Sequence, residues 1–163
     1  MTERELQEFE KTYEAFSPLV YRIALSHMKS REDAEDLLHD VFIKFMEKMP
    51  RLHHDEHKRA WLVRVTVNAC VDALRKKQYR NHLSLDEVAE TVSTERTEKA
   101  DVFYALDALA TQDKTIILLH DLEGYPIKEI SFMLGITLSA AKMRLARARD
   151  RLKKLMEREG ENV

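Results

Sequence analysis

The chain contains very few of the residues that let a backbone turn sharply. Its 163 residues include 3 glycines and 3 prolines. Sandwiches and barrels need glycine, proline, asparagine or aspartate at most of their hairpins, because tight turns require unusual backbone angles. A many-stranded β fold is therefore disfavoured, and the length fits one average domain or two small helical ones. We predict an all-α protein.

Apolar residues at spacings of three and four predict helices along the first 80 residues. Ser17 followed by Pro18 is typical of an N-cap and a first helical residue, so we expect two consecutive helices before residue 30. Ser30 and Asp33 resemble a capping box that opens a helix closed by Pro50. Its expected apolar positions are Ala34, Leu37, Leu38, Val41, Phe42, Phe45, Met46 and Met49.

After a polar loop over residues 51–56, a further helix carries an apolar face and ends in basic residues. The apolar positions are Trp61, Leu62, Val65, Ala69, Ala73 and Leu74. The spacing of Trp61 with Leu62 and Val65 favours a core position over an exposed stacking platform. We expect four helices of this kind to close one small bundle over residues 1–80.

Residues 81–98 are acidic and rich in serine and threonine, and we interpret them as a flexible linker. A second domain over residues 99–163 begins with a helix presenting Val102, Leu106 and Leu109, and Thr111 is expected to cap the next helix. A short helix over 126–134 ends at Gly135, and a long one runs from Leu138 to about Glu157. Its expected buried stripe is Leu138, Ala141, Leu145, Ala148, Leu152 and Leu155. Two helices joined by a tight glycine turn, the second of them basic, predict a helix-turn-helix.

The net charge of −2 averages over segments of opposite sign. Residues 31–47 hold two basic and six acidic side chains, whereas residues 58–80 hold seven basic and one acidic. The second half repeats this, with two basic and six acidic over 101–135, then eight basic and two acidic over 136–158. Two basic helices of this kind indicate two contact surfaces for a polyanion, with solvated helix faces as the alternative interpretation.

Several other classes of protein are disfavoured. No apolar run approaches the ~20 residues of a membrane-spanning helix. The N-terminus has neither a cationic nor an apolar segment, so we expect no secretory signal, and the single Cys70 fits a reducing cytoplasm. His53, His54 and His57 lie close together, but adjacent histidines in one loop make poor joint ligands and we expect no metal. We also expect no cofactor and no catalytic residue, because no phosphate-binding loop, nucleophile elbow or zinc spacing is present.

Four stretches of the chain resemble a known family. REDAEDLLHDVFIKF over residues 31–45 and AWLVRVTVNACVDALRKK over 60–77 look like region two of the bacterial extracytoplasmic-function sigma factors. LEGYPIKEISFMLGIT over 122–137 and AAKMRLARAR over 140–149 look like region four of that family. The resemblance covers nearly the whole chain, with both motifs in the family's order.

The resemblance implies a cytoplasmic, non-enzymatic initiation subunit. Its implied partners are core RNA polymerase (the clamp of the largest subunit and the flap of the second) and promoter DNA. An anti-sigma factor is implied as well, and whether that factor is anchored in a membrane is left open. No insertion of this chain itself into a membrane is expected. The alternatives are an operator-binding helix-turn-helix regulator, which leaves the first domain without a purpose, and a metal-dependent nuclease, which lacks a convergent set of carboxylates.

The resemblance also implies three sets of contact residues. For core polymerase they are Asp36, Leu37, His39, Asp40 and Phe42, with His39 where the family usually has glutamine. For the minus-ten element, Asn68 is implied to contact an unstacked base, while phosphates are held by Lys58, Arg59, Arg75, Lys76 and Lys77. For the minus-thirty-five element, the side facing the bases is formed by Ser139, Lys142, Met143 and Ala146, with Arg144, Arg147 and Arg149 on phosphates.

The sequence departs from the family pattern beside the helix-turn-helix. Ser131 replaces a small apolar residue, and Ala140, Ala141 and Met143 replace the usual threonine, valine and serine. The preferred promoter sequence is therefore not transferable from the family.

Overall fold

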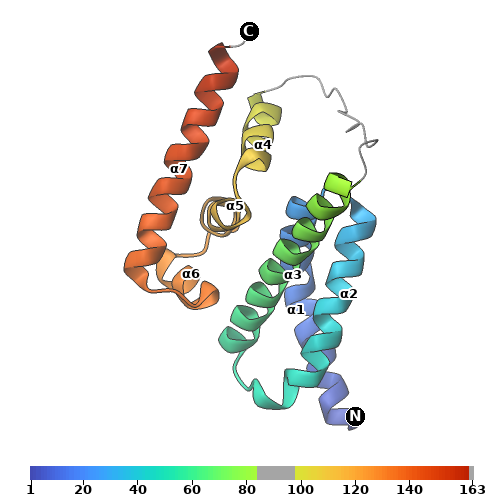
Figure 1. The fold of residues 1–163 in the computed structure, drawn as a ribbon. Coiled ribbons are helices and arrows are strands. Elements are labelled where there is room, and N and C mark those ends of the chain that lie inside the picture. Colours follow the sequence, from blue (N-terminus) through green and yellow to red (C-terminus); the bar gives the residue numbers. More distant parts are fainter. Residues whose placement is uncertain (84–97, 162–163) are drawn as a thin grey trace.

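The computed structural model describes residues 1–83 and 98–161, and within these ranges every regular element is helical (Figure 1). The all-α prediction is therefore confirmed. In chain order the elements are α1 (Glu3–Met28), α2 (Arg31–Lys48), the 3₁₀ turn η1 (Met49–Arg51), α3 (Asp55–Leu83), α4 (Glu98–Ala108), α5 (Thr111–Ile117), the π-helical turn η2 (Leu118–Leu122), α6 (Ile127–Leu134) and α7 (Leu138–Glu161).

The first domain is a bundle of α1, α2 and α3 around an aromatic core. Phe45 is fully buried at its centre, and the Tyr13 and Phe42 rings meet edge to face at 4.8 Å between centroids. Trp61 lies 5.9 Å from Phe45 and is partly buried, so its predicted place in the core is confirmed. Cys70 belongs to the same core with no exposed surface, and burial raises the pKa of its thiol to about 12.

The prediction of two consecutive helices before residue 30 was wrong, because α1 is one helix of 26 residues with Pro18 inside it. Pro18 lacks the N–H that would bond to the preceding turn, which normally kinks or ends a helix. Here it is exposed, and the buried stripe continues past it through Leu19, Val20 and Ile23. Packing of that stripe outweighs one missing hydrogen bond, so the first domain has three helices rather than the expected four.

Three smaller predictions about helix ends and faces were also wrong. Thr111 is the first residue of α5 rather than its cap, since Ala110 holds the N-cap position without a side-chain hydrogen bond. Met46 and Leu138 were expected in the core, but each is 40% exposed. Ser30 does cap α2 as predicted, because its hydroxyl accepts a hydrogen bond from the Asp33 amide at 3.3 Å.

The second domain places α4 to α7 around one apolar cluster. Ile116, Leu119, Ile130 and Ala141 are fully buried within it. As predicted, α6 ends at Gly135, whose φ of +68° lies in the left-handed region that glycine tolerates best. This turn swings the chain from α6 into α7 and produces the expected helix-turn-helix.

The two domains pack against each other through an extension of that cluster. Leu19 and Ile23 of α1 and Ala60, Val63 and Val67 of α3 join it, so helices of the first domain complete the core of the second. In Figure 1, α5 and α6 accordingly lie on the side of α3 away from α2.

Polar contacts also join the two domains. Arg22 pairs with Glu123 through two hydrogen bonds of 2.6 and 2.9 Å. The Lys114 ammonium donates to the carbonyl of Ser26 and pairs with Asp107 at 2.6 Å. His27 Nε2 lies 3.0 Å from Thr115 Oγ1 in a buried contact.

The predicted linker over residues 81–98 lies largely outside the described ranges, since α3 continues to Leu83 and α4 begins at Glu98. Among the described residues no helix is long and apolar enough to cross a bilayer.

We predict that Gly135→Ala destabilises the second domain. The positive φ costs any side-chain-bearing residue roughly 1 kcal/mol. An added Cβ would also stand 3.2 Å from Arg64 Nε, so the Arg64 guanidinium would have to shift. Gly124→Ala is the matched control, because Gly124 has a φ of +78° and nothing within 4 Å of the added carbon. Urea unfolding should show the larger loss for Gly135→Ala, and equal losses would contradict a role for the Arg64 contact.

We predict that acid weakens the fold through His27. Burial, and to a lesser extent the nearby Lys114 charge, lowers the pKa of His27 to about 4. The unfolded chain therefore binds this proton more readily, so stability is complete above the unfolded pKa of 6.5 and declines as the pH falls toward 4. Between pH 7 and pH 5 the expected loss from this group is about 2 kcal/mol.

The variant His27→Gln tests this by keeping a donor for Thr115 while removing the titration. Its free energy of unfolding in urea should lose about 2 kcal/mol less between pH 7 and pH 5 than that of the wild type. His39→Gln, at an exposed position of α2, should keep the wild-type acid loss. An unchanged acid loss in His27→Gln would rule out His27 as its source.

Candidate nucleic-acid interface

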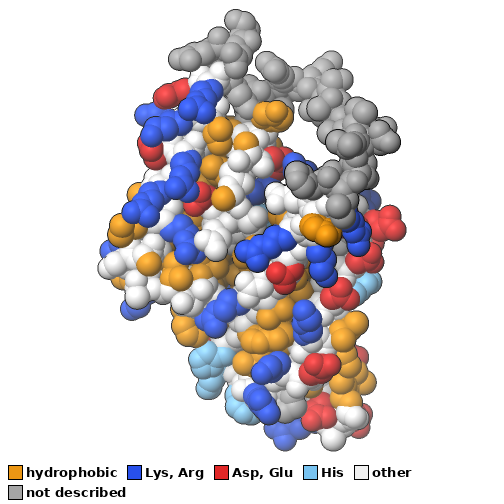
Figure 2. All heavy atoms as spheres, in the orientation of Figure 1, with side chains coloured by type: hydrophobic (Ala, Val, Ile, Leu, Met, Phe, Trp, Pro, Cys, Tyr) orange, Lys and Arg blue, Asp and Glu red, His pale blue; other side chains and the backbone are white. Residues whose placement is uncertain are grey.

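The outward face of α7 presents the residues predicted to face bases. Ser139, Lys142 and Ala146 are exposed, and Met143 is 53% exposed. The opposite face is buried through Ala141, Leu145 and Ala148 and packs into the second domain. Figure 2 shows Lys and Arg side chains following the edge of the molecule where α7 lies.

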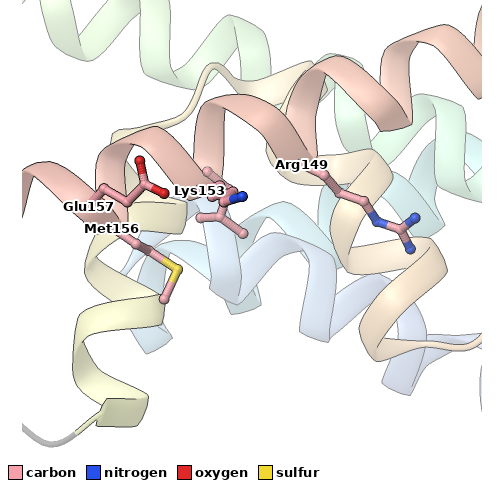
Figure 3. A pocket seen from close by; sticks show the side chains of 5 residues that line it. Arg149, Lys153, Met156 and Glu157 are labelled. Carbon is pink, nitrogen blue, oxygen red and sulfur yellow. The ribbon is translucent and has the colours of Figure 1, made fainter.

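The three arginines predicted to hold phosphates differ in their availability. Arg147 is exposed and Arg144 is partly buried. Arg149 binds Asp121 of η2 through contacts of 2.5 and 3.3 Å, and the hydrogen bonds from Arg149 hold the pKa of the Asp121 carboxyl below its usual value. Arg149 also lines one end of a shallow hollow of about 420 Å³ along α7, together with Lys153 and Met156, and in Figure 3 its guanidinium points away from these two residues. Arg149 therefore fastens α7 to η2.

The second basic surface follows α3. Asn68 is exposed, as are Arg75, Lys76 and Lys77 toward the C-terminal half of the helix. Arg64, which was not predicted from the sequence, is also exposed and shares the face of Asn68 and Arg75, because residues four and eleven positions apart align on a helix. The helical spacing to Asn68 could have identified it.

Two predicted phosphate ligands on α3 are occupied by protein groups instead. Lys58 is only 5% exposed and donates to Glu8 at 3.0 Å, and this hydrogen bond lowers the pKa of Glu8. The Arg59 guanidinium lies 5.1 Å from the ring centroid of Tyr125 and donates to Glu129 at 3.3 Å. Lys58 thus ties α3 to α1, and Arg59 ties α3 to the second domain.

The histidine-rich loop before α3 leads into the domain boundary. His53 and His54 precede α3, whereas His57 lies in its first turn. All three are exposed, and the His57 ring lies 5.6 Å from that of Phe132 in α6. No group of three or more His, Cys, Asp or Glu side chains in residues 1–83 and 98–161 is arranged to hold a metal ion.

The acidic face of α2 divides into exposed and buried members. Asp36, His39 and Asp40 are exposed, whereas Leu37 and Phe42 are 7% and 3% exposed and belong to the core of the first domain. Ile43, which the sequence analysis did not select, is 58% exposed at the next turn of the same face, followed by Met46. The helical repeat of 3.6 residues, counted from Asp36 and Asp40, would have identified both Ile43 and Met46.

A cleft of about 580 Å³ separates α2 from the C-terminal half of α3. Asp36 and Asp40 line one wall, Lys76 and Lys77 line the other, and the floor is apolar. The acidic and basic surfaces of the first domain therefore share one cleft.

Two helical domains, the second a helix-turn-helix with an exposed basic face, define a class of transcription factor. Residues 12–80 match the family description "Sigma-70 region 2", and residues 100–152 match "Sigma-70, region 4". Together with a relative that bears the family's name, these matches show that the chain belongs to the extracytoplasmic-function family of RNA polymerase sigma factors.

Curated relatives agree with this assignment. The chain is 30% identical over 150 residues to the ECF RNA polymerase sigma factor SigM of Mycobacterium tuberculosis, an alignment covering 91% of this chain and 76% of the relative. It is 30% identical over 131 residues to the RNA polymerase sigma factor SigV of Bacillus subtilis, covering 78% of each. The protein is thus a transcription initiation factor of the sigma type.

Solved structures share the fold. The sigma factor RpoE of Bartonella quintana, solved with the anti-sigma factor NepR, matches with a TM-score of 0.72 and 23% identity, covering 93% of this chain and 98% of that one. CnrH, solved with the cytosolic domain of CnrY, matches with a TM-score of 0.67 and 22% identity over 93% and 89% of the two chains.

Proposed function

We propose that this sigma factor acts without catalysis in the cytoplasm, binding core RNA polymerase through α2 and promoter DNA through α3 and α7. We assign residues 1–80 to core binding and minus-ten recognition, 81–98 to a linker, and 99–163 to minus-thirty-five recognition. The observation that carries the proposal is the presence, within one small protein, of exposed carboxylates on α2 and exposed basic side chains on both α3 and α7.

The α2 face has the chemistry for a basic helical partner. Asp36 and Asp40 supply negative charge, while Ile43 and Met46 supply apolar surface that a solvated face would not need. Leu37 and Phe42 support this face from beneath, since both are buried. The proposed contact set is thus Asp36, His39, Asp40, Ile43 and Met46, docking on the clamp of the largest polymerase subunit, while the second domain meets the flap.

The two basic faces differ in what they offer to DNA. On α7, we assign Lys142 and Met143 to base edges and Arg147 to a phosphate, because all three are exposed on the second helix of the helix-turn-helix. On α3, Asn68 offers a donor and an acceptor to an unpaired base, and Arg75, Lys76 and Lys77 supply charge beside it.

An anti-sigma factor is a further proposed partner. RpoE of Bartonella quintana, which shares this fold, was solved with the anti-sigma factor NepR, and CnrH was solved with the cytosolic domain of CnrY. Exposed apolar residues on α2 would need cover in the absence of polymerase, which a protein inhibitor supplies.

The operator-binding alternative explains α6 and α7 but gives the exposed acidic face of α2 no partner. Binding to core RNA polymerase distinguishes a sigma factor from an operator-binding regulator.

We predict that Asp36→Lys with Asp40→Lys abolishes co-elution with core RNA polymerase, because it reverses the charge facing a basic partner. Glu10→Lys with Glu14→Lys is the control, since it changes the net charge equally at exposed positions of α1. Size-exclusion chromatography with purified core enzyme gives the readout. Equal binding by both double variants would show that the docking surface is not the α2 face. Failure of the folded wild type to bind core polymerase would favour an operator-binding regulator.

We predict that Arg147→Ala and Arg149→Ala behave differently. Arg147→Ala should lower the salt slope of duplex DNA binding by about 0.9. Arg149→Ala should instead lower the free energy of unfolding by up to about 1 kcal/mol, because it breaks a half-exposed pair with Asp121. Salt titrations on a random-sequence duplex and urea unfolding measure the two effects. A salt slope lowered by Arg149→Ala with unchanged stability would make Arg149 a phosphate ligand.

A further inference from the structure

Arg64 stands on the DNA-facing side of α3 but is bound to the helix-turn-helix. Its Nη2 donates to the carbonyl of Phe132 at 2.8 Å and its Nε to that of Met133 at 3.1 Å. These carbonyls lie in the last turn of α6, where a helix leaves its acceptors unsatisfied and favours a cation. The space over Gly135 is filled by the same guanidinium. Arg64 therefore caps α6 from the other domain.

Arg64 also completes a row on α3. It precedes Asn68 by four residues and Arg75 by eleven, so the three share one helix face. Arg59, five residues before Arg64 on a neighbouring side of α3, is likewise held by the second domain through Tyr125 and Glu129. Its Nε has no hydrogen-bond partner among the described residues. The Arg64 guanidinium at the start of the row is therefore engaged by α6 although Arg64 keeps exposed surface, while Asn68 and Arg75 are exposed further along α3.

While its two domains are packed against each other, the protein cannot contact both promoter elements at once. The minus-ten and minus-thirty-five elements are about 25 base pairs apart, or roughly 85 Å of duplex at 3.4 Å per pair. The longest helix, α3, has 29 residues and spans roughly 44 Å. Because α6 lies directly against α3, the reading face of α7 and the face of α3 belong to one compact body. Simultaneous contact requires the domains to separate, and separation releases Arg59 and Arg64.

We propose that Arg64 is a further DNA-binding residue with two alternative partners. It holds the α6 carbonyls while the domains are packed and a phosphate of the minus-ten strand once they part. Domain packing and minus-ten DNA then compete for the same guanidinium, and by linkage each weakens the other. The reading face of α7 stays exposed throughout, so duplex binding through α7 is independent of packing. This inference rests on the proposed function.

The pair between Arg22 and Glu123 allows packing to be changed away from the DNA-facing row. Arg22→Glu and Glu123→Arg each replace a bidentate attraction by a like-charge repulsion but change the net charge in opposite directions. The double variant with both changes restores an opposite-charge pair and the wild-type net charge. The readouts are the radius of gyration from small-angle X-ray scattering and the affinity for fluorescein-labelled single-stranded dT12.

We expect both single variants to expand the protein and to bind dT12 at least about 5-fold more tightly, as a typical coupling energy allows. Tighter binding by Arg22→Glu is the decisive result, because its added negative charge alone would weaken binding. The double variant should return to wild-type values. If the single variants leave the radius of gyration unchanged, or expand the protein without tighter binding, the competition is overturned.

The role of Arg64 itself is tested in the Glu123→Arg variant, in which we expect the domains to be separated. Arg64→Ala combined with Glu123→Arg should bind dT12 about 5-fold more weakly than Glu123→Arg alone and lower the salt slope by about 0.7. Arg64→Lys should keep that slope, since it keeps the charge. Arg4→Ala in the same background is the control at an exposed position of α1. An unchanged slope in Arg64→Ala would overturn the DNA role of Arg64.

Co-elution with core polymerase separates this inference from the proposed function. Arg64→Ala and the Arg22 and Glu123 variants leave the α2 face intact, so each should bind core enzyme. Loss of polymerase binding by the wild type refutes the proposed function, whereas unchanged dT12 binding with normal polymerase binding refutes the competition alone.

Discussion

The double burial of α3 is the constraint on which the rest of the structure depends. Leu62 and Cys70 on one side of this helix belong to the core of the first domain, while Ala60, Val63 and Val67 on other sides complete the core of the second. The helix is therefore apolar around much of its middle, and its exposed polar side chains there are confined to a narrow strip. That strip carries Arg64 and Asn68, so packing and candidate DNA contacts compete for the surface of one helix.

Most of the fold followed from periodicity and from a few residues with fixed backbone preferences. Ser30 and Gly135 marked a helix start and a helix end correctly, because a cap and a left-handed φ depend on local chemistry. Pro18 misled the prediction because the outcome depended on the packing of α1 against two other helices, which local sequence does not reveal. The packing of the two domains against each other was not predicted for the same reason.

The sequence predicted which types of residue form the candidate site, but not which of them are free to contact DNA. Lys58, Arg59 and Arg149 read as free cations in the sequence, and each is bound to a carboxylate brought close by tertiary structure. Glu8, Glu129 and Asp121 lie 50, 70 and 28 positions away respectively, beyond any helical spacing. Conversely, the exposure of Ile43 is a local property of α2 that counting turns from Asp36 would have shown.

The burial of Cys70 has a practical chemical consequence. Its thiol is enclosed by the core, and the raised pKa keeps it protonated at neutral pH, so alkylating reagents and metal ions meet no thiolate in the folded chain. A cysteine introduced anywhere on the surface would then be the single reactive position, and a fluorophore or spin label could be attached there without removing the native residue. Labelling of Cys70 itself would report opening of the first domain's core and nothing else.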